Sequence, residues 1–330
     1  MDARLESLEQ WDAAPRSERV ELARVLADRL QEQGKPLDFE ELLEIEPFRP
    51  EASMPRLPKR HVALFRDKAA KVSFALIPGG QVPRWGEPQE KAILRAMQAI
   101  EGWRDDAATR GIAQVRPYGA SGFDVQSMFE EAPKLAPFLV AVRAITAATP
   151  GLDHLDWKKT RMSHAQKGEA REIALLEGEL PALLQARGWS LPTRHQAWWM
   201  TAPDPRWVFP WGDKLPKWMC DGEDGEEPSE EEDDRDPFGA AFPYDSADEG
   251  FERANAFGLV DLLAASYWVQ LEGELGWHGG AAECYPWQAC GEWAGFISRA
   301  VAPEPDPAKD RYAHNFGHRL RPVISIGEPA

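Results

Sequence analysis

The stretch NAFGLVD at residues 255–261 combines turn-forming Asn and Gly with a large aromatic side chain. The same mixture recurs in LPTRHQAWW at residues 191–199, in FPWGD at residues 209–213 and in NFGHRL at residues 315–320. Ten of the fourteen tryptophans lie after residue 188. Asn and Gly favour turns, and an indole ring can fill space between loops while its N–H binds a loop carbonyl. The C-terminal half is therefore expected to be a loop-rich domain held together by buried tryptophans.

The net charge of −17 is concentrated in one short stretch. Residues 221–236 contain eleven Asp or Glu and one Arg, so they alone carry −10 of the total. Such a run repels itself and is typical of a disordered insertion. The alternative is an acidic strip that docks a basic partner. A chain with this charge repels phosphate backbones, so nucleic acid is not an expected partner.

The composition also bears on the compartment. The longest apolar runs are shorter than the roughly 18 residues that a membrane helix needs, so no membrane association is expected. The first residues, MDARLE, lack the apolar core of a signal peptide. Three cysteines, Cys220, Cys284 and Cys290, are too few for a disulfide scaffold. These observations together predict a cytoplasmic protein.

Apolar periodicity and turn residues predict a mixed α+β protein. Residues 1–46 are expected to be helical, with the apolar stripe of one helix at residues 22–30 and a second helix at residues 39–45. A proline-rich linker at residues 47–60 should follow. Further on, strands are expected at 72–77 and 138–145, and helices at 88–104 and 168–187, the last ending at Gly188.

Six short motifs, in order, resemble those of the formylglycine-generating-enzyme (sulfatase-modifying-factor) family. They are IPGG at 77–80, the segment from APF at 136–138 to IT at 145–146, LPT followed by Trp198, PWGD at 210–213, NAFGLVD at 255–261, and the closing pair GG at 279–280 and GHRL at 317–320. The resemblance covers residues 71–325 and implies a C-type-lectin-like fold of class α+β. Residues 1–60 then form a helical N-terminal segment with a linker, and residues 88–135 and 221–236 are insertions.

The resemblance fails where the family binds calcium. The family continues its NxFGLYDM motif with GNVWEW, whose Asn and Glu hold the ion. This chain has AASYWV at residues 264–269, with Ala265 and Trp268 in those two places. Calcium needs six to eight oxygen ligands, and Ala and Trp side chains supply none. The family's calcium site is therefore expected to be absent.

Cysteine spacing decides whether the family's oxidation chemistry can be expected. Active members carry two cysteines five residues apart that bind Cu(I), a soft ion suited to thiolates. Here Cys284 and Cys290 are six apart and lie further upstream. Under one interpretation they hold Cu(I) and act as the catalytic residues of an oxygen-dependent oxidase that converts a substrate cysteine to formylglycine. Under the other they are inert thiols.

The favoured interpretation is a non-catalytic family member, a pseudoenzyme that binds a protein or peptide and needs no cofactor. Lectin-like folds present irregular loops on a stable base, and such loops suit recognition. The expected binding surface consists of six tryptophans, a residue type enriched at binding hot spots. They are Trp207, Trp211, Trp218, Trp277, Trp287 and Trp293. Most of them could equally be core residues.

Overall fold

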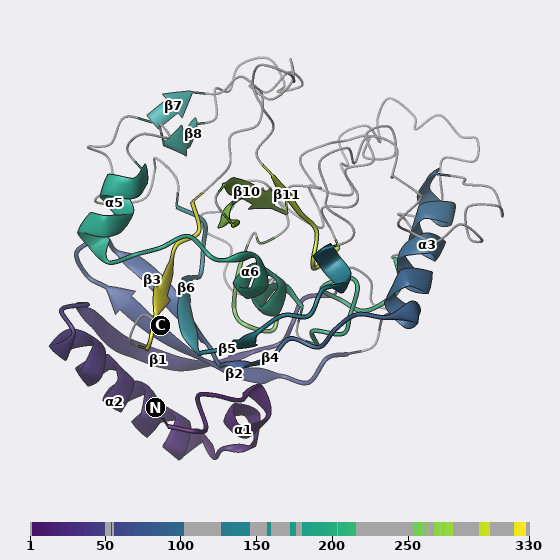
Figure 1. Cartoon of the computed structure of the whole chain (residues 1–330). Helices are drawn as coiled ribbons and strands as arrows, with labels where there is room; N and C mark the ends of the chain where they lie inside the picture. Colours follow the sequence, from purple (N-terminus) through teal and green to yellow (C-terminus); the bar gives the residue numbers. More distant parts are fainter. Residues whose placement is uncertain are drawn as a thin grey trace, which may run out of the picture.

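The computed structural model of the chain describes residues 2–49, 54, 56–101, 127–145, 157–159, 172–175, 180–202, 204–215, 254–260, 262, 267–272, 274–279, 297–303 and 320–327. All three cysteines and the acidic stretch at 221–236 lie outside these residues. The described part is of class α+β, because its sheets are antiparallel and its helices pack against them (Figure 1).

The main sheet is antiparallel and has five strands in the order β1-β2-β3-β6-β12. It joins the two ends of the chain, because N-terminal and C-terminal strands pair with the central ones (Figure 1). The strands are β1 (Leu37–Ile45), β2 (Arg60–Asp67), β3 (Val72–Ile77), β6 (Phe138–Ala141) and β12 (Val323–Ser325). The strands β1 and β2 therefore lie in the same sheet as β3.

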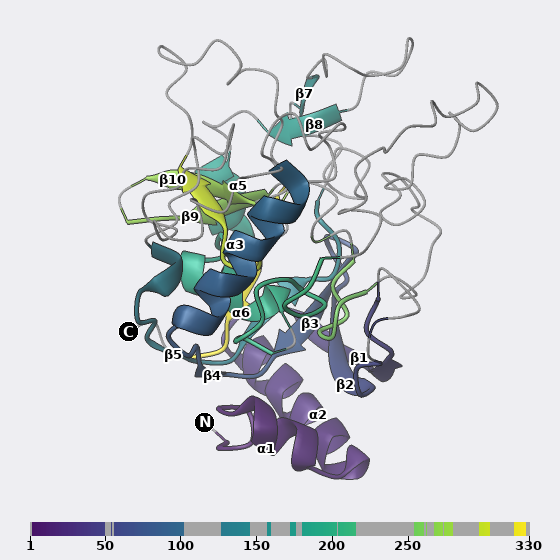
Figure 2. The same ribbon diagram turned by 90° about the vertical axis from the view of Figure 1, so that its right-hand side faces the viewer.

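Two N-terminal helices, α1 (Leu8–Ala13) and α2 (Arg16–Glu32), cover one side of this sheet (Figures 1 and 2). Trp11 of α1 and the buried apolar residues of α2 share a hydrophobic cluster with β2 and β3. Trp11 is 1% exposed, and its indole nitrogen donates to the carbonyl of His61. His61 lies in β2, outside the part of β2 that pairs with β3. The helix α2 ends at Glu32, and Gly34 follows its C-cap with a φ of 77°, in the left-handed region that glycine adopts after helix C-termini.

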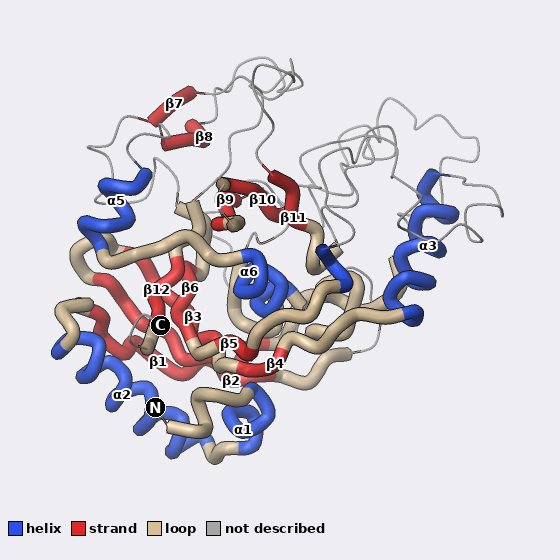
Figure 3. Tube along the Cα trace, viewed as in Figure 1, coloured by secondary structure: helices blue, strands red, loops and turns tan. Residues whose placement is uncertain are grey.

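The other side of the sheet carries helix α6 (Arg194–Thr201) and a second, three-stranded sheet of order β11-β10-β9 (Figure 3). Its strands are β9 (Tyr267–Gln270), β10 (Leu275–His278) and β11 (Val301–Pro303). Seven further elements lie around this half: α3 (Glu87–Glu101), α5 (Leu180–Arg187), a 3-10 turn (Ser127–Phe129), the pair β4 (Gly80–Gln81) and β5 (Lys134–Leu135), and the pair β7 (Trp157–Lys159) and β8 (Glu172–Leu175). Among the described residues, loops form much of the chain around α6. The tryptophan-rich composition of the C-terminal half predicts such a loop-rich region.

The helix with its apolar stripe at 22–30, the strand at 72–77 and the helix at 88–104 match α2, β3 and α3. The strand predicted at 138–145 is shorter, because β6 ends at Ala141. The helix predicted at residues 39–45 is wrong, because these residues form β1. Apolar residues at 39, 42, 43 and 45 satisfy a helical period, but in the strand a bulge between Phe39 and Glu41 puts Leu42 in the same hydrophobic cluster as Phe39. Leu43 and Ile45 pack in the other cluster. Pairing with β2 thus overrides the local pattern.

The helix predicted at residues 168–187 is also shorter than expected. The helix α5 begins only at Leu180, and Glu172–Leu175 pair with Trp157–Lys159 as strands. The predicted end is confirmed, since Gly188 has a φ of 63° and donates its N–H to the Gln185 carbonyl. The Trp189 N–H reaches back to Leu184, which completes the usual glycine-terminated helix end.

The IPGG turn requires glycine because a tryptophan side chain covers it. A Cβ built on Gly80 would lie 2.4 Å from Cζ2 of Trp199, and the Trp199 indole nitrogen donates to the Pro78 carbonyl at 2.8 Å. A Cβ on Gly79 would lie 2.5 Å from the Leu135 carbonyl oxygen. The turn and α6 are therefore packed directly on each other.

We expect Gly80→Ala to lower the free energy of unfolding by about 1–3 kcal/mol, because the added methyl group must displace the Trp199 ring. Urea denaturation measures the change. Gly86→Ala is the matched control, since the nearest atom to its added Cβ is 3.9 Å away. It should change stability by no more than about 1 kcal/mol. Equal effects of the two substitutions would contradict the packing argument.

Candidate functional site

Arg299 holds three loops together from the inside of the molecule. Its side chain is 1% exposed, and it donates to the carbonyls of Met128 at 3.0 Å, Pro205 at 3.1 Å and Pro83 at 2.5 Å. These acceptors come from three segments that are distant in sequence. We call Arg299 and the segments 82–86, 127–129 and 204–208 the loop base.

The charge of Arg299 is balanced by dipoles and aromatic rings. Its guanidinium carbon lies 4.4 Å from the centre of the Trp85 ring and 5.2 Å from that of Trp198. Within the described residues no carboxylate forms an ion pair with it. Burial lowers the pKa of Arg299 to about 9, which leaves it charged at neutral pH. Carbonyl oxygens and π faces therefore stabilise this cation, and its role in the fold is to fix the loop backbones.

The segment 204–215 forms a tight turn on the loop base, as the PWGD motif predicts. Phe209 and Gly212 exchange backbone hydrogen bonds of 2.8 and 3.1 Å, and Gly212 has a φ of 134°. The Val208 N–H donates to Asp213 Oδ1, and Ser298 donates to the carbonyls of Val208 and Trp207. The turn is therefore attached to the segment that carries Arg299.

Three of the six predicted surface tryptophans lie in the described part of the chain. Trp207 is half-buried on the loop base, and Trp277 is half-buried in β10, where it pairs with Ala302. Trp211 is 7% exposed and its ring stacks on Phe209 at 5.9 Å, so it packs the turn. The structure thus attaches Trp207 and Trp277 to one short segment, residues 297–303. The remaining predicted residues, Trp218, Trp287, Trp293, Cys284 and Cys290, lie outside the described residues.

The NAFGLVD motif forms a loop with internal hydrogen bonds, and it also binds the end of α6. The Asn255 side-chain oxygen accepts the N–H groups of Phe257 and Leu259 at 3.0 and 3.1 Å. Its amide nitrogen donates to the carbonyls of Met200 and Thr201, the last two residues of α6. One side chain therefore fixes the loop and satisfies carbonyls that a helix C-terminus leaves without partners.

The start of α6 is capped by the LPT motif. Thr193 Oγ1 accepts the Gln196 N–H at 3.2 Å, and Gln196 Oε1 accepts the Thr193 N–H at 2.9 Å. Gln196 thus completes the capping box. His195 lies half-buried with its ring edge-on to Trp198 at 5.0 Å, and burial lowers its pKa.

Sequence reasoning missed Arg299, Trp85 and His195 as members of this region. A lone arginine in the apolar segment GFISRAV at residues 295–301 is a signal that could have found Arg299, because a charged side chain there needs buried partners. Nothing in the local sequence indicates that these partners come from residues 83, 128 and 205.

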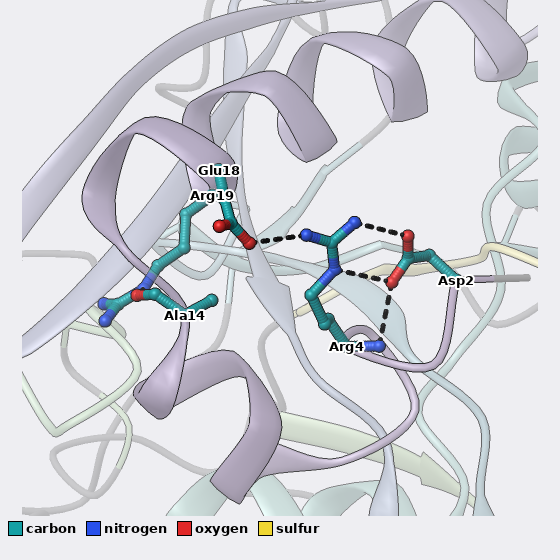
Figure 4. A network of polar contacts seen from close by, with 5 residues as sticks. All are labelled: Asp2, Arg4, Ala14, Glu18 and Arg19. Carbon is teal, nitrogen blue, oxygen red and sulfur yellow. Dashed lines mark hydrogen bonds and ion pairs between the residues drawn. The ribbon is translucent and has the colours of Figure 1, made fainter.

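A second polar cluster lies at the N-terminus (Figure 4). Arg4 binds both oxygens of Asp2 and also Glu18 of α2. The hydrogen bonds from Arg4 to Asp2 lower the pKa of Asp2 to about 2. Arg19 donates to the carbonyls of Ala14 and Asp12. Because its charges pair internally and are partly exposed, this cluster fixes the first residues on α2 and offers little attraction to a charged ligand.

Comparison of the chain with protein-family models, with curated proteins and with solved structures finds no significant match. Among the described helices, none is both long and apolar enough to cross a membrane. Within the same residues, no three or more His, Cys, Asp or Glu side chains gather as metal ligands. The family resemblance thus rests on the sequence motifs.

We expect Asn255→Ala to lower the free energy of unfolding by about 2–4 kcal/mol. The substitution removes the acceptor of two backbone N–H groups and the donor to two backbone carbonyls, which then lack partners. Thermal or urea denaturation measures this change. Gln270→Ala is the matched control: its amide also binds two carbonyls, those of Leu271 and Glu274, but Gln270 is exposed. It should cost less than about 1 kcal/mol. A similar small cost for Asn255→Ala would contradict the assigned role.

Proposed function

We propose that this protein is a non-catalytic module of the formylglycine-generating-enzyme type that binds a protein or peptide over the loop base. The observation that carries the proposal is that Arg299 fixes the backbones of three loops next to the half-buried Trp207. With its three cysteines, the chain is proposed to act in the cytoplasm.

Rigidity supports a binding role for this surface. A loop that must become ordered on binding loses affinity through lost conformational entropy, and a loop held in advance avoids that cost. Residues 204–208 are held by Arg299, Trp85 and Ser298, and Trp85 donates its indole N–H to Pro205 at 3.0 Å. A tryptophan on such a backbone can contribute a large contact area at low entropic cost.

Charge around Trp207 supports an apolar protein segment as the ligand. The Arg206 side chain forms two hydrogen bonds with Asp204, and its backbone N–H donates a third. This ion pair neutralises the charges nearest to Trp207 in sequence. Asp213 is engaged by the Val208 N–H. The chain as a whole is acidic, which disfavours nucleic acid.

The first test uses a photo-crosslinking amino acid at position 207 of the full chain, expressed in its native cell. We expect a discrete crosslinked partner from position 207 and none from position 24, because Arg24 is exposed on α2, on the opposite side of the main sheet. With that partner purified, Trp207→Ala should weaken binding by about 2 kcal/mol, or roughly 30-fold in Kd.

Arg24→Ala serves as the matched control and should leave the Kd unchanged. Circular dichroism and denaturation must show that both variants keep the fold. An unchanged Kd for Trp207→Ala, or the same partner crosslinked from position 24, would contradict the proposed surface.

Copper binding gives an independent test against the oxidase interpretation. Titration of the reduced protein with Cu(I) against a chelator of known affinity should show no stoichiometric site tighter than about 1 nM. Cys290→Ser and the control Cys220→Ser should then behave as the unmodified chain does. Tight stoichiometric binding that disappears only in Cys290→Ser would overturn the non-catalytic assignment and favour a formylglycine-generating oxidase.

A further inference from the structure

The backbone of the segment around Trp207 makes a hydrogen bond at every N–H and C=O group from residue 205 to residue 209. Four N–H groups lie in this stretch, because Pro205 has none. They donate, in chain order from residue 206, to Asp204 Oδ1, the Asp204 carbonyl, Asp213 Oδ1 and the Gly212 carbonyl, at 2.8–3.0 Å. Each N–H group is a single donor, so these donors are fully used.

The carbonyl groups of the same stretch already have donors. Residues 85–89 and 298–299 supply most of these donors, although both segments are far away in the sequence. In the order of the carbonyls from 205 to 209, the donors are Trp85 Nε1 together with Arg299 Nη2, then Gln89 Nε2, Ser298 Oγ, the Ser298 N–H and the Gly212 N–H. The loop that carries Trp207 therefore satisfies its backbone inside this chain.

The two neighbouring segments of the loop base are held in the same way. Arg299 donates to the carbonyls of Pro83 and Met128, and Arg84 Nε donates to that of Phe129 at 3.2 Å. Pro83 has no N–H group. At these positions too, side chains of the chain itself occupy carbonyls that a partner could otherwise bind.

This backbone disfavours an extended peptide as the partner. A peptide that adds as a strand is bound through its main-chain N–H and C=O groups. Laid along residues 205–209, its carbonyls would meet only N–H groups that are already engaged. Covering polar groups without giving them partners costs free energy, so such a segment would lose affinity with each residue that it buries.

A helical segment avoids this cost. Its backbone N–H and C=O groups bond to one another within the helix, so side chains alone face the protein that it binds. Next to Trp207, the Arg206 side chain is paired with Asp204. The two residues that follow, Val208 and Phe209, are 0% exposed. The half-buried Trp207 indole is then what this segment offers to an incoming apolar side chain.

We propose that the partner is a protein that presents an amphipathic helix, whose apolar face packs on Trp207. This inference rests on the proposed function, since it names the kind of segment that the loop base binds. One face of a helix places apolar side chains three or four residues apart. An extended segment would instead contact Trp207 with alternate residues. The spacing of the contacting residues in the partner therefore distinguishes the two.

Backbone hydrogen exchange of the full chain, read by NMR, tests the premise without a partner. The amides of residues 206–209 should exchange at least about tenfold more slowly than their intrinsic rates, because each one is hydrogen-bonded. Exchange at the intrinsic rates would overturn the proposal, since these N–H groups would then be open to an extended peptide. The crosslinking test of the proposed function does not depend on this result.

An alanine scan of the partner tests the shape of the bound segment. The partner used is the protein crosslinked from position 207, and the scan covers its crosslinked segment within the intact protein. Substitutions spaced three or four residues apart should each raise the Kd about tenfold or more, and those between them less than about threefold. Against Trp207→Ala these losses should shrink, whereas against the control Arg24→Ala they should remain.

The outcomes separate this inference from the proposed function. Losses at every second residue, or without helical spacing, overturn the helix, while a weaker Kd for Trp207→Ala keeps the binding surface. Losses that are the same against Trp207→Ala and the unmodified chain overturn the contact between the helix and Trp207. If no partner is crosslinked from position 207, the proposed function and this inference both fail.

Discussion

The half of the molecule around α6 is constrained by carbonyl groups that must be hydrogen-bonded although no neighbouring strand is available to them. Irregular backbone can be buried only if side chains supply the missing donors. Arg299 supplies them to residues 83, 128 and 205, Asn255 to the end of α6, Trp199 to Pro78, and Arg321 to Ala141, Val142 and Val260. The loops therefore have a defined conformation because a few long polar side chains reach them from distant segments.

This constraint explains which features can be predicted from the sequence. The cap at Thr193, the PWGD turn and the helix ends at Gly34 and Gly188 are local, since each depends on residues within a few positions. The strand at 72–77 is also predictable, because its residues are apolar on both faces and are bounded by the turn at 78–80. These elements carry their own signals in the sequence.

Other features depend on partners that the local sequence does not contain. Residues 37–45 have a helix-compatible pattern and become β1 because β2 pairs with them. Arg299 contacts a carbonyl 216 positions away, and His278 meets Thr201 across 77 positions. The tryptophans illustrate the same limit: Trp207 and Trp211 are four residues apart, yet the turn between them leaves one half-buried and buries the other. Composition predicts that such residues are buried or used for binding, but tertiary contacts decide which.

The helix α6 connects the three-stranded sheet to the proposed binding surface. Its last residue, Thr201, meets both Asn255 and His278, and its middle carries Trp198, against which the Arg299 guanidinium rests. Arg299 is in turn two residues before β11, which pairs with the strand that ends at His278. His278, α6 and residues 297–303 are therefore connected by contacts that lead back to Arg299 in the loop base. Because packed interiors move between discrete arrangements rather than deforming gradually, a change at one of these contacts is expected to shift Arg299 and Trp207 together.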